Sequence, residues 1–347
     1  MSETPPVGMA PQGDALRTSR VAVFGAGAMG TAIAMHAARR GHRVSLWANP
    51  HDRTAFEAMK DEGRHPSLPE HLPDGVVLFG PDELDAAAAG VEIAIMAAHS
   101  DAARSLARMV GDAVAGARSL VSVAKGLENE TGRRISEVYA EELPVRSVVA
   151  VGGPCLAPEL AQGAPSAVVW AGKTVEAARE AGSPIADSHY QIQFSDDVVG
   201  VEYSAVAKNV GAIGLGLLDG LGKLRALPMQ NARAALFTRA ATELAVLVAA
   251  LGGREETALG LAGVGDLVVT GQGGRNRLFG ELVGEGGDPL EVVASMRAQG
   301  LTVEGIDSAR HVHRLAGETG LDLPYHLAVY RVLFEGKDPH HVLEVLC

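Results

Sequence analysis

The fold of this chain is decided by the stretch Val21-Ala22-Val23-Phe24-Gly25-Ala26-Gly27-Ala28-Met29-Gly30-Thr31-Ala32-Ile33-Ala34-Met35. Its first four residues predict a strand, and the residues after the glycines predict a helix. In such a turn the first glycine permits a tight bend, the second lets a pyrophosphate approach the backbone, and the third lets helix and strand pack closely. Free N–H groups and the dipole at the helix N-terminus favour phosphates there. The residues expected to bind a dinucleotide are therefore Gly25, Gly27, Ala28, Met29 and Gly30.

A second predicted strand, at residues 43–47, completes a strand–helix–strand unit. In NAD binders an acidic residue at the end of this strand usually holds the ribose 2′-hydroxyl. Here the neutral Asn49 takes that place and would not repel a 2′-phosphate, and Arg53 could pair with one. The sequence therefore slightly favours NADP over NAD, unless Arg53 is an ordinary arginine in the first turn of a helix.

Short apolar runs continue to alternate with helical patterns as far as about residue 200. This alternation predicts an α/β N-terminal domain with a doubly wound parallel sheet of the Rossmann type. Further strands are expected at Val76–Phe79, Ile93–Ala97, Leu120–Val123, Val148–Val151 and Ala167–Trp170, with helices that include Asp101–Val110 and Arg133–Glu142.

Strand patterns largely disappear beyond Val201, which predicts an all-α C-terminal domain. We expect Gly220, Gly222 and Pro228 to separate its first two helices. The expected organisation is a flexible tail at 1–18, a dinucleotide-binding Rossmann domain at 19–203 and a helical substrate or catalytic domain at 204–347. The helices of the last domain are expected at Val201–Leu218, Met229–Leu251, Leu290–Arg297, Ile306–Thr319 and Leu327–Phe334.

Charge and composition restrict the kind of partner. Among 347 residues, Lys and Arg number 30 and Asp and Glu 42, so the net charge is −12. This balance argues against nucleic acid and anionic membranes, and an anionic small molecule would need basic side chains gathered locally. Cys155 and Cys347 fit no disulfide framework or metal-ligand pattern, so no metal is expected. Without a secretory signal pattern or an apolar run of about 18 residues, we expect a cytoplasmic protein with no membrane span.

Lys208 is the strongest catalytic candidate from the residues alone. It lies inside the otherwise apolar helical segment at 200–210, near the expected domain junction. Burying an ammonium is costly unless it is paired or its pKa falls. A lysine with a lowered pKa can protonate an alkoxide as a hydride reaches the adjacent carbon. The alternative is a lysine that snorkels from the helix edge into solvent.

Several further segments occur in a characteristic order: Gly25–Thr31, Val123–Glu128, Gly153-Pro154, Gly200–Asn209, Leu261–Leu267, Arg275-Asn276-Arg277 and Val303-Glu304-Gly305. Together they resemble bacterial-type NAD(P)-dependent glycerol-3-phosphate dehydrogenases, from about residue 20 to about residue 340. The resemblance implies a Rossmann domain followed by a helical domain. It also implies reversible reduction of dihydroxyacetone phosphate to sn-glycerol 3-phosphate.

The resemblance implies catalytic roles for two residues. Lys208 is similar to the family's proton donor and acceptor, and Asp266 to the acidic residue that contacts substrate and orients that lysine. Lys125 is similar to the lysine that lies between cofactor and substrate. From the residues alone, Asp266 could instead cap a helix and Lys125 could be a surface loop lysine.

The same resemblance implies a set of binding residues. Arg275 and Asn276 match the pair that holds the substrate phosphate, with Arg275 also reaching the cofactor. Glu304 matches a cofactor-contacting glutamate, and Gly153 and Cys155 lie in the substrate loop. An Arg fork suits the geometry of a phosphate, although Arg275 could also be a solvated loop arginine.

Four places depart from the usual family pattern. Cys155 stands where a hydroxyl residue is usual, and Gly274 where a serine precedes Arg-Asn, so two hydrogen-bonding hydroxyls are lost. Ala98-His99-Ser100 replaces Val-Pro-Ser, and the connection at 222–228 is longer and less acidic. The same reaction on a different phosphorylated hydroxy or keto compound is therefore an alternative.

Two other readings are open. A β-hydroxyacid-type dehydrogenase would share the architecture, but a substrate carboxylate would leave Arg275 and Asn276 without an obvious role. An NADP(H)-sensing regulator would be expected to lose the Lys208 and Asp266 pair, and both are present. The expected partner is a small phosphorylated substrate. The sequence leaves the oligomeric state open, with a homodimer as one option.

Overall fold

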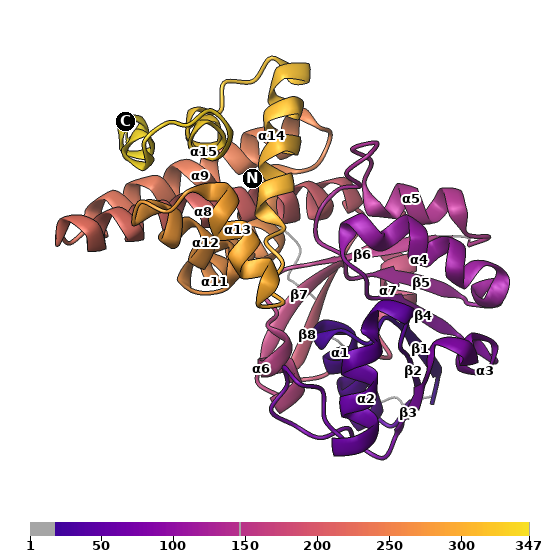
Figure 1. Cartoon of the computed structure of the whole chain (residues 1–347). Coiled ribbons are helices and arrows are strands. Elements are labelled where there is room, and N and C mark those ends of the chain that lie inside the picture. The colour runs from indigo at the N-terminus through magenta and orange to yellow at the C-terminus, as the bar shows by residue number, and fades with distance from the viewer. Residues whose placement is uncertain (1–17, 146, 347) are drawn as a thin grey trace.

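The structure is a computed structural model that describes residues 18–145 and 147–346. The expected tail lies almost wholly outside the described residues, as does Cys347. An α/β part is followed by an all-helical part, as Figure 1 shows, so the predicted fold class is confirmed. No helix in the described ranges is long and apolar enough to cross a membrane.

An eight-stranded sheet forms the first part of the molecule, in the order β3-β2-β1-β4-β5-β6-β7-β8. Neighbouring strands run parallel except for the antiparallel pair β6 and β7. The last strand, Tyr190–Ser195, was not among the predicted ones. The strands are β1 (Arg20–Phe24), β2 (Arg43–Trp47), β3 (Val76–Phe79), β4 (Ile93–Met96), β5 (Ser119–Ser122), β6 (Val148–Gly152), β7 (Ser166–Ala171) and β8 (Tyr190–Ser195).

Helices cover both faces of this sheet, and a separate apolar cluster lies on each face. The central strands are buried on both sides, which is why they read as short continuous apolar runs rather than alternating ones. The helices are α1 (Ala28–Arg39), α2 (Arg53–Glu62), α3 (Leu84–Ala88), α4 (Ala103–Val110), α5 (Ile135–Glu142), α6 (Ala157–Gln162) and α7 (Val175–Gly182).

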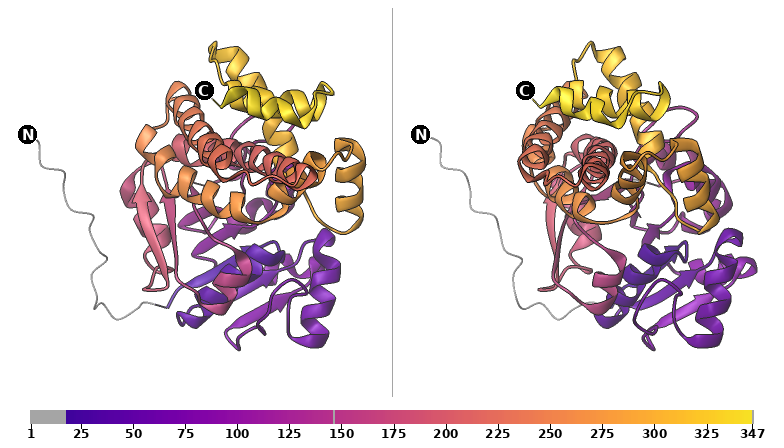
Figure 2. Two further views of the ribbon diagram at one scale, coloured as in Figure 1. Left: turned by 90° about the vertical axis from the view of Figure 1, so that its left-hand side faces the viewer. Right: turned by 60° about the vertical axis from the view of Figure 1, so that its left-hand side comes forward.

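The second part is built around α8 (Val198–Arg225), a helix of 28 residues that is buried along most of its length. Figure 2 shows this helical part stacked on one end of the sheet, with α8 among the other helices. The remaining helices are α9 (Gln230–Ala250), α10 (Glu255–Leu259), α11 (Asp266–Gln272), α12 (Arg275–Gly284), α13 (Pro289–Ala298), α14 (Gly305–Thr319) and α15 (Pro324–Phe334).

The expectation that Gly220 and Gly222 interrupt the first helix is wrong, because α8 continues through both. A Cβ on Gly220 would lie 2.2 Å from the backbone oxygen of Glu281 in α12. A Cβ on Gly284 of α12 would likewise lie 2.3 Å from the oxygen of Leu217. The glycines therefore let two helix backbones touch, and tertiary packing outweighs the low helix propensity of glycine.

Candidate active site

The glycine turn after β1 has the geometry of an anion-binding site. Gly25 has φ +117°, and a Cβ on it would lie 2.5 Å from the backbone oxygen of Ala97. A Cβ on Gly27 would meet no described atom within 4 Å, so this backbone faces open space. Helix α1 begins there without a side-chain cap and without an acidic residue in its first turn. The N–H groups of Ala28, Met29 and Gly30 thus fit a cofactor pyrophosphate.

The end of β2 is linked to the glycine turn through Asp52, which the sequence analysis did not single out. Its Oδ2 accepts from the backbone N–H of Ala26 at 2.8 Å and from that of Asn49 at 3.2 Å. The Asn49 side chain in turn accepts from the N–H of His51 at 2.7 Å. Arg53 is exposed at the start of α2. Asn49 and Arg53 thus lie near the turn, with the Asn49 oxygen already engaged.

Two lysines from different parts of the chain meet at one buried carboxylate. Lys125, in the loop after β5, donates to Asp266 Oδ2 at 2.6 Å and to the backbone oxygen of Gly153 at 3.2 Å. Lys208, on α8, has its Nζ 3.2 Å from Asp266 Oδ1 and donates to Thr270 Oγ1 at 2.9 Å. The structure therefore brings together Lys125, Gly153, Lys208 and Asp266.

The electrostatics of this cluster separate the two amines. Burial lowers the pKa of Lys208 to about 8, even though Asp266 favours its charged form. Burial also opposes charge on Lys125, but there Asp266 outweighs it and the pKa is raised. Asp266 keeps a pKa below its usual range, because the two ammonium groups outweigh the effect of burial. One amine is thus held charged, while the other can exchange a proton near neutral pH.

The asparagines beside this cluster form a short chain of hydrogen bonds. Asn276 donates to Asn209 Oδ1 at 2.9 Å and accepts from the backbone N–H of Gly305 at 3.0 Å. The buried Nδ2 of Asn209 has no hydrogen-bond partner within the described part of the chain. An unsatisfied buried donor next to Lys208 is the kind of group that a ligand oxygen completes.

The two arginines of the segment Arg275-Asn276-Arg277 differ in their surroundings. Arg275 is exposed at the start of α12, after Gly274 with φ +91°. Arg277 donates to Asp219 at 2.8 Å and to Glu281 at 2.9 Å, so its charge is already compensated. Of the two, Arg275 is therefore the one suited to an anionic ligand.

Cys155 lies close enough to Lys125 and Asp266 for their charges to affect the pKa of its thiol. Burial raises the pKa of its thiol to about 11, and the nearby Lys125 only partly offsets this. A thiol with such a pKa is protonated at neutral pH, which argues against a nucleophilic role.

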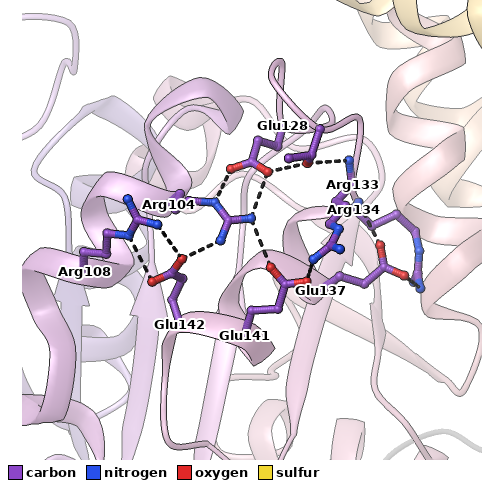
Figure 3. Close-up of polar contacts among 9 residues, drawn as sticks. Arg104, Arg108, Glu128, Arg133, Arg134, Glu137, Glu141 and Glu142 are labelled. Carbon is purple, nitrogen blue, oxygen red and sulfur yellow. Dashed lines mark hydrogen bonds and ion pairs between the residues drawn. The ribbon is translucent and has the colours of Figure 1, made fainter.

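The loop that carries Lys125 is anchored by an ion-pair network, drawn in Figure 3. Arg104 on α4 donates to both oxygens of Glu128, at 2.5 and 2.9 Å, and to Glu142 on α5 at 2.5 Å. Arg108 also donates to Glu142, at 3.0 Å. The bidentate contact fixes Glu128, three residues after Lys125, and so restricts this loop.

Two polar residues around Lys208 were not predicted from the sequence. Thr270 is hydrogen-bonded to Lys208 and, at 3.3 Å, to Asp266 Oδ1. Its position one helical turn after Asp266 was the available signal, since residues four apart share a helix face. Asn209 follows Lys208 directly, but nothing local distinguishes its buried amide from a core asparagine.

The glycine turn lies at the carboxyl edge of the sheet, and the cluster of Lys125, Asp266 and Lys208 lies at the same edge. This combination defines a nucleotide-dependent oxidoreductase of two-domain Rossmann type. Sequence comparison is more specific. The models for the N-terminal and C-terminal parts of NAD-dependent glycerol-3-phosphate dehydrogenase match residues 20–178 and 197–344. The chain belongs to the NAD-dependent glycerol-3-phosphate dehydrogenase family, whose members use NAD or NADP.

Individual relatives agree over nearly the whole chain. A glycerol-3-phosphate dehydrogenase [NAD(P)+] from Geobacillus kaustophilus is 37% identical over 333 residues, 94% of this chain and 93% of the relative. One from Chlorobium limicola is 36% identical over 322 residues, 91% of this chain and 94% of the relative. The crystal structure of glycerol-3-phosphate dehydrogenase from Coxiella burnetii is 33% identical with a TM-score of 0.82, covering 95% of this chain and 98% of that one.

Proposed function

We propose that this protein interconverts sn-glycerol 3-phosphate and dihydroxyacetone phosphate with NAD(P), and that Lys208 is the proton donor and acceptor. The observation that carries the proposal is the buried Lys208 amine, held 3.2 Å from Asp266 and 2.9 Å from Thr270 with a pKa of about 8. A general acid–base group works best when its pKa lies near the working pH.

The proposed mechanism divides the work among the residues of the cluster. When bound, the nicotinamide supplies or accepts the hydride at the carbinol carbon. Lys208 gives its proton to the developing alkoxide during ketone reduction and takes it back during alcohol oxidation. Asp266 orients Lys208, and Lys125 stays charged and stabilises negative charge on the substrate oxygen. Thr270 holds the Lys208 amine in one direction through its hydroxyl.

The substrate phosphate is assigned to the side of the cluster that faces α12. Arg275 and Asn276 begin this helix, and the unsatisfied amide of Asn209 adds a donor. In a chain of net charge −12, these residues together with Lys125 and Lys208 concentrate the donors that a dianion needs. Glu304 and Gly153 complete the proposed cofactor and substrate contacts.

Two observations support a second candidate, the same reaction on a larger phosphorylated ketone or aldehyde. Cys155 offers only a weakly hydrogen-bonding thiol beside Lys125, and Gly274 offers no side chain beside Arg275. Each neutral hydrogen bond contributes only about 0.5–1.5 kcal/mol, so the missing hydroxyls alter preference rather than remove binding.

The proposal extends to the choice of cofactor and to the cellular location. The exposed guanidinium of Arg53 supports NADP over NAD. The cysteine content supports a cytoplasmic location.

The test is NADPH oxidation with dihydroxyacetone phosphate and with a panel of other phosphorylated ketones and aldehydes. Lys208→Ala should lower kcat by about 10²- to 10⁴-fold and leave NADPH affinity unchanged. The exposed Lys173 supplies the matched control, Lys173→Ala. For the wild type, kcat/KM of ketone reduction should fall above a pH of about 8, where Lys208 loses its proton. Unchanged turnover in Lys208→Ala would contradict the assignment.

A further inference from the structure

One contact between the two parts of the molecule has no role in the mechanism above. His99 Nδ1 lies 2.8 Å from Glu304 Oε1, across 205 positions of sequence. His99 precedes the short helix η3 (Ser100–Ala102) after β4, whereas Glu304 immediately precedes α14. About half of the His99 side chain is exposed, while that of Glu304 is only 20% exposed. The imidazole is therefore the more exposed partner of this pair, and the carboxylate the more buried one.

The loop that carries His99 also touches the glycine turn. A Cβ on Gly25 would lie 2.5 Å from the Ala97 oxygen, and one on Gly30 would lie 2.9 Å from the Ala97 Cβ. Glu304 is close enough to Lys208 for its charge to favour the ammonium form. The His99–Glu304 contact thus lies between the turn that fits a pyrophosphate and the amine that exchanges a proton.

We propose that His99 is a positioning residue, which holds Glu304 between the two domains and, as an imidazolium, strengthens binding of the anionic cofactor. The hydrogen bond uses Oε1 of Glu304, and the proposal assigns Oε2 to the bound cofactor. This inference rests on the proposed function for the identity of the cofactor.

The charges around His99 support both halves of this role. The groups that face it are Glu304 before α14, Arg275 at the start of α12 and Asp101 in its own turn. The hydrogen bond to Glu304 outweighs burial and Arg275, so the pKa of His99 is raised above that of a free histidine. Burial opposes the charge of Glu304, but His99 and Arg275 outweigh it and keep its pKa low.

Protonation of His99 changes the local charge balance. When His99 is neutral, three cationic groups face two carboxylates. The cations are Lys125, Lys208 and Arg275, and the carboxylates are those of Asp266 and Glu304. An imidazolium adds one further positive charge next to the site of a pyrophosphate. Because its folded pKa is raised, the imidazolium is fully present at low pH and is lost as the pH rises through that pKa. Cofactor affinity should fall over the same range.

The experiment measures dissociation constants of NADPH by fluorescence titration of the full chain, from about pH 6 to about pH 9. For the wild type we expect the dissociation constant to rise about tenfold across this range. His99→Ala should show the weak, high-pH value throughout. His99→Gln keeps a donor without a charge, so it should recover part of the affinity but not the pH step. His340→Ala changes an exposed histidine far along the chain and should behave as wild type.

NADH serves as a parallel probe, because it lacks the 2′-phosphate that itself titrates near pH 6. The same step with NADH assigns the titration to the protein, and a step confined to NADPH would overturn the proposal. Nuclear magnetic resonance of the His99 ring proton gives a second readout. Glu304→Gln should lower the pKa of His99 toward about 6.5, and an unchanged pKa would also overturn it.

These outcomes are separable from those of the proposed function. If dihydroxyacetone phosphate is not reduced but His99→Ala loses the pH step in cofactor binding, the proposed function fails and the role of His99 stands. If the substrate is reduced and His99→Ala binds cofactor as wild type does at every pH, only the role of His99 fails.

Discussion

Two groups of charged side chains in this molecule differ in how positive and negative groups are balanced. The network in Figure 3 sets four arginines against four glutamates, and each charge there meets an opposite one. The cluster at Asp266 sets two lysines against one carboxylate, and the side chains of Lys208 and Asp266 are only 6% and 2% exposed. A balanced network serves structure, whereas an excess of positive charge around a buried carboxylate is costly and is kept where an anionic ligand completes it.

The largest effect should come from removing the shared carboxylate with Asp266→Asn. The ammonium groups of Lys125 and Lys208 would then lose their common partner, so the pKa of each should fall. We expect kcat/KM to drop by about 10²- to 10⁴-fold and the free energy of unfolding by about 3–5 kcal/mol, measured by steady-state kinetics and denaturant titration.

A surface carboxylate provides the control for this variant. Glu318 pairs with Arg314 at 2.7 Å, and both side chains are about half exposed. Glu318→Gln should change stability by less than about 1 kcal/mol and leave turnover unaffected. If Asp266→Asn retained wild-type turnover, the pairing of Asp266 with the two lysines would not be needed for catalysis.

A smaller effect is expected where α8, which carries Lys208, meets α12. In Gly220→Ala the new Cβ would lie 2.2 Å from the Glu281 oxygen, so the helices must separate. Such overpacking costs about 1–3 kcal/mol, which urea unfolding would detect.

The matched control is Gly317→Ala on α14. A Cβ there meets no described atom within 4 Å, so the change should stabilise the protein by up to about 1 kcal/mol through helix propensity. Equal effects of the two substitutions on stability would contradict the close approach of α8 and α12.

Local patterns account for most of what could be predicted. The glycine turn, the strands around it and the buried Lys208 each depend on neighbours in sequence, and the sheet of the structure contains every predicted strand. The strand Tyr190–Ser195 was missed because its polar residues interrupt the apolar run, as an edge strand with one exposed face allows.

Features that depend on distant partners could not be predicted. The sequence around Gly220 gives no sign that another helix backbone lies against it, so the glycine predicted a helix break. The His99–Glu304 contact and the fixed position of Asp52 depend on residues brought together only by the fold. The family resemblance pointed to Lys125 and Asp266. It did not predict that the pKa of Lys208 lies below that of Lys125.

The smallest effect on turnover is expected from this network, although it anchors the loop of Lys125. Arg104→Met removes the group that binds Glu128 and Glu142, and the Glu128 side chain is only 7% exposed, so we expect a loss of about 1–3 kcal/mol in stability. A salt concentration of about 1 M should change this loss little, because screening acts much less on partly buried pairs. Arg133→Ala, at the exposed rim of the network, should change less still.

Turnover should distinguish this network from the cluster at Asp266. With Lys125 still bonded to Asp266 and to Gly153, kcat/KM of Arg104→Met should stay within about threefold of wild type. A folded Arg104→Met that lost activity as severely as Asp266→Asn would show that Glu128 and its arginine belong to the active site. The position of Lys125 would then depend on the charges of this network, and a balanced network would carry function as well as structure.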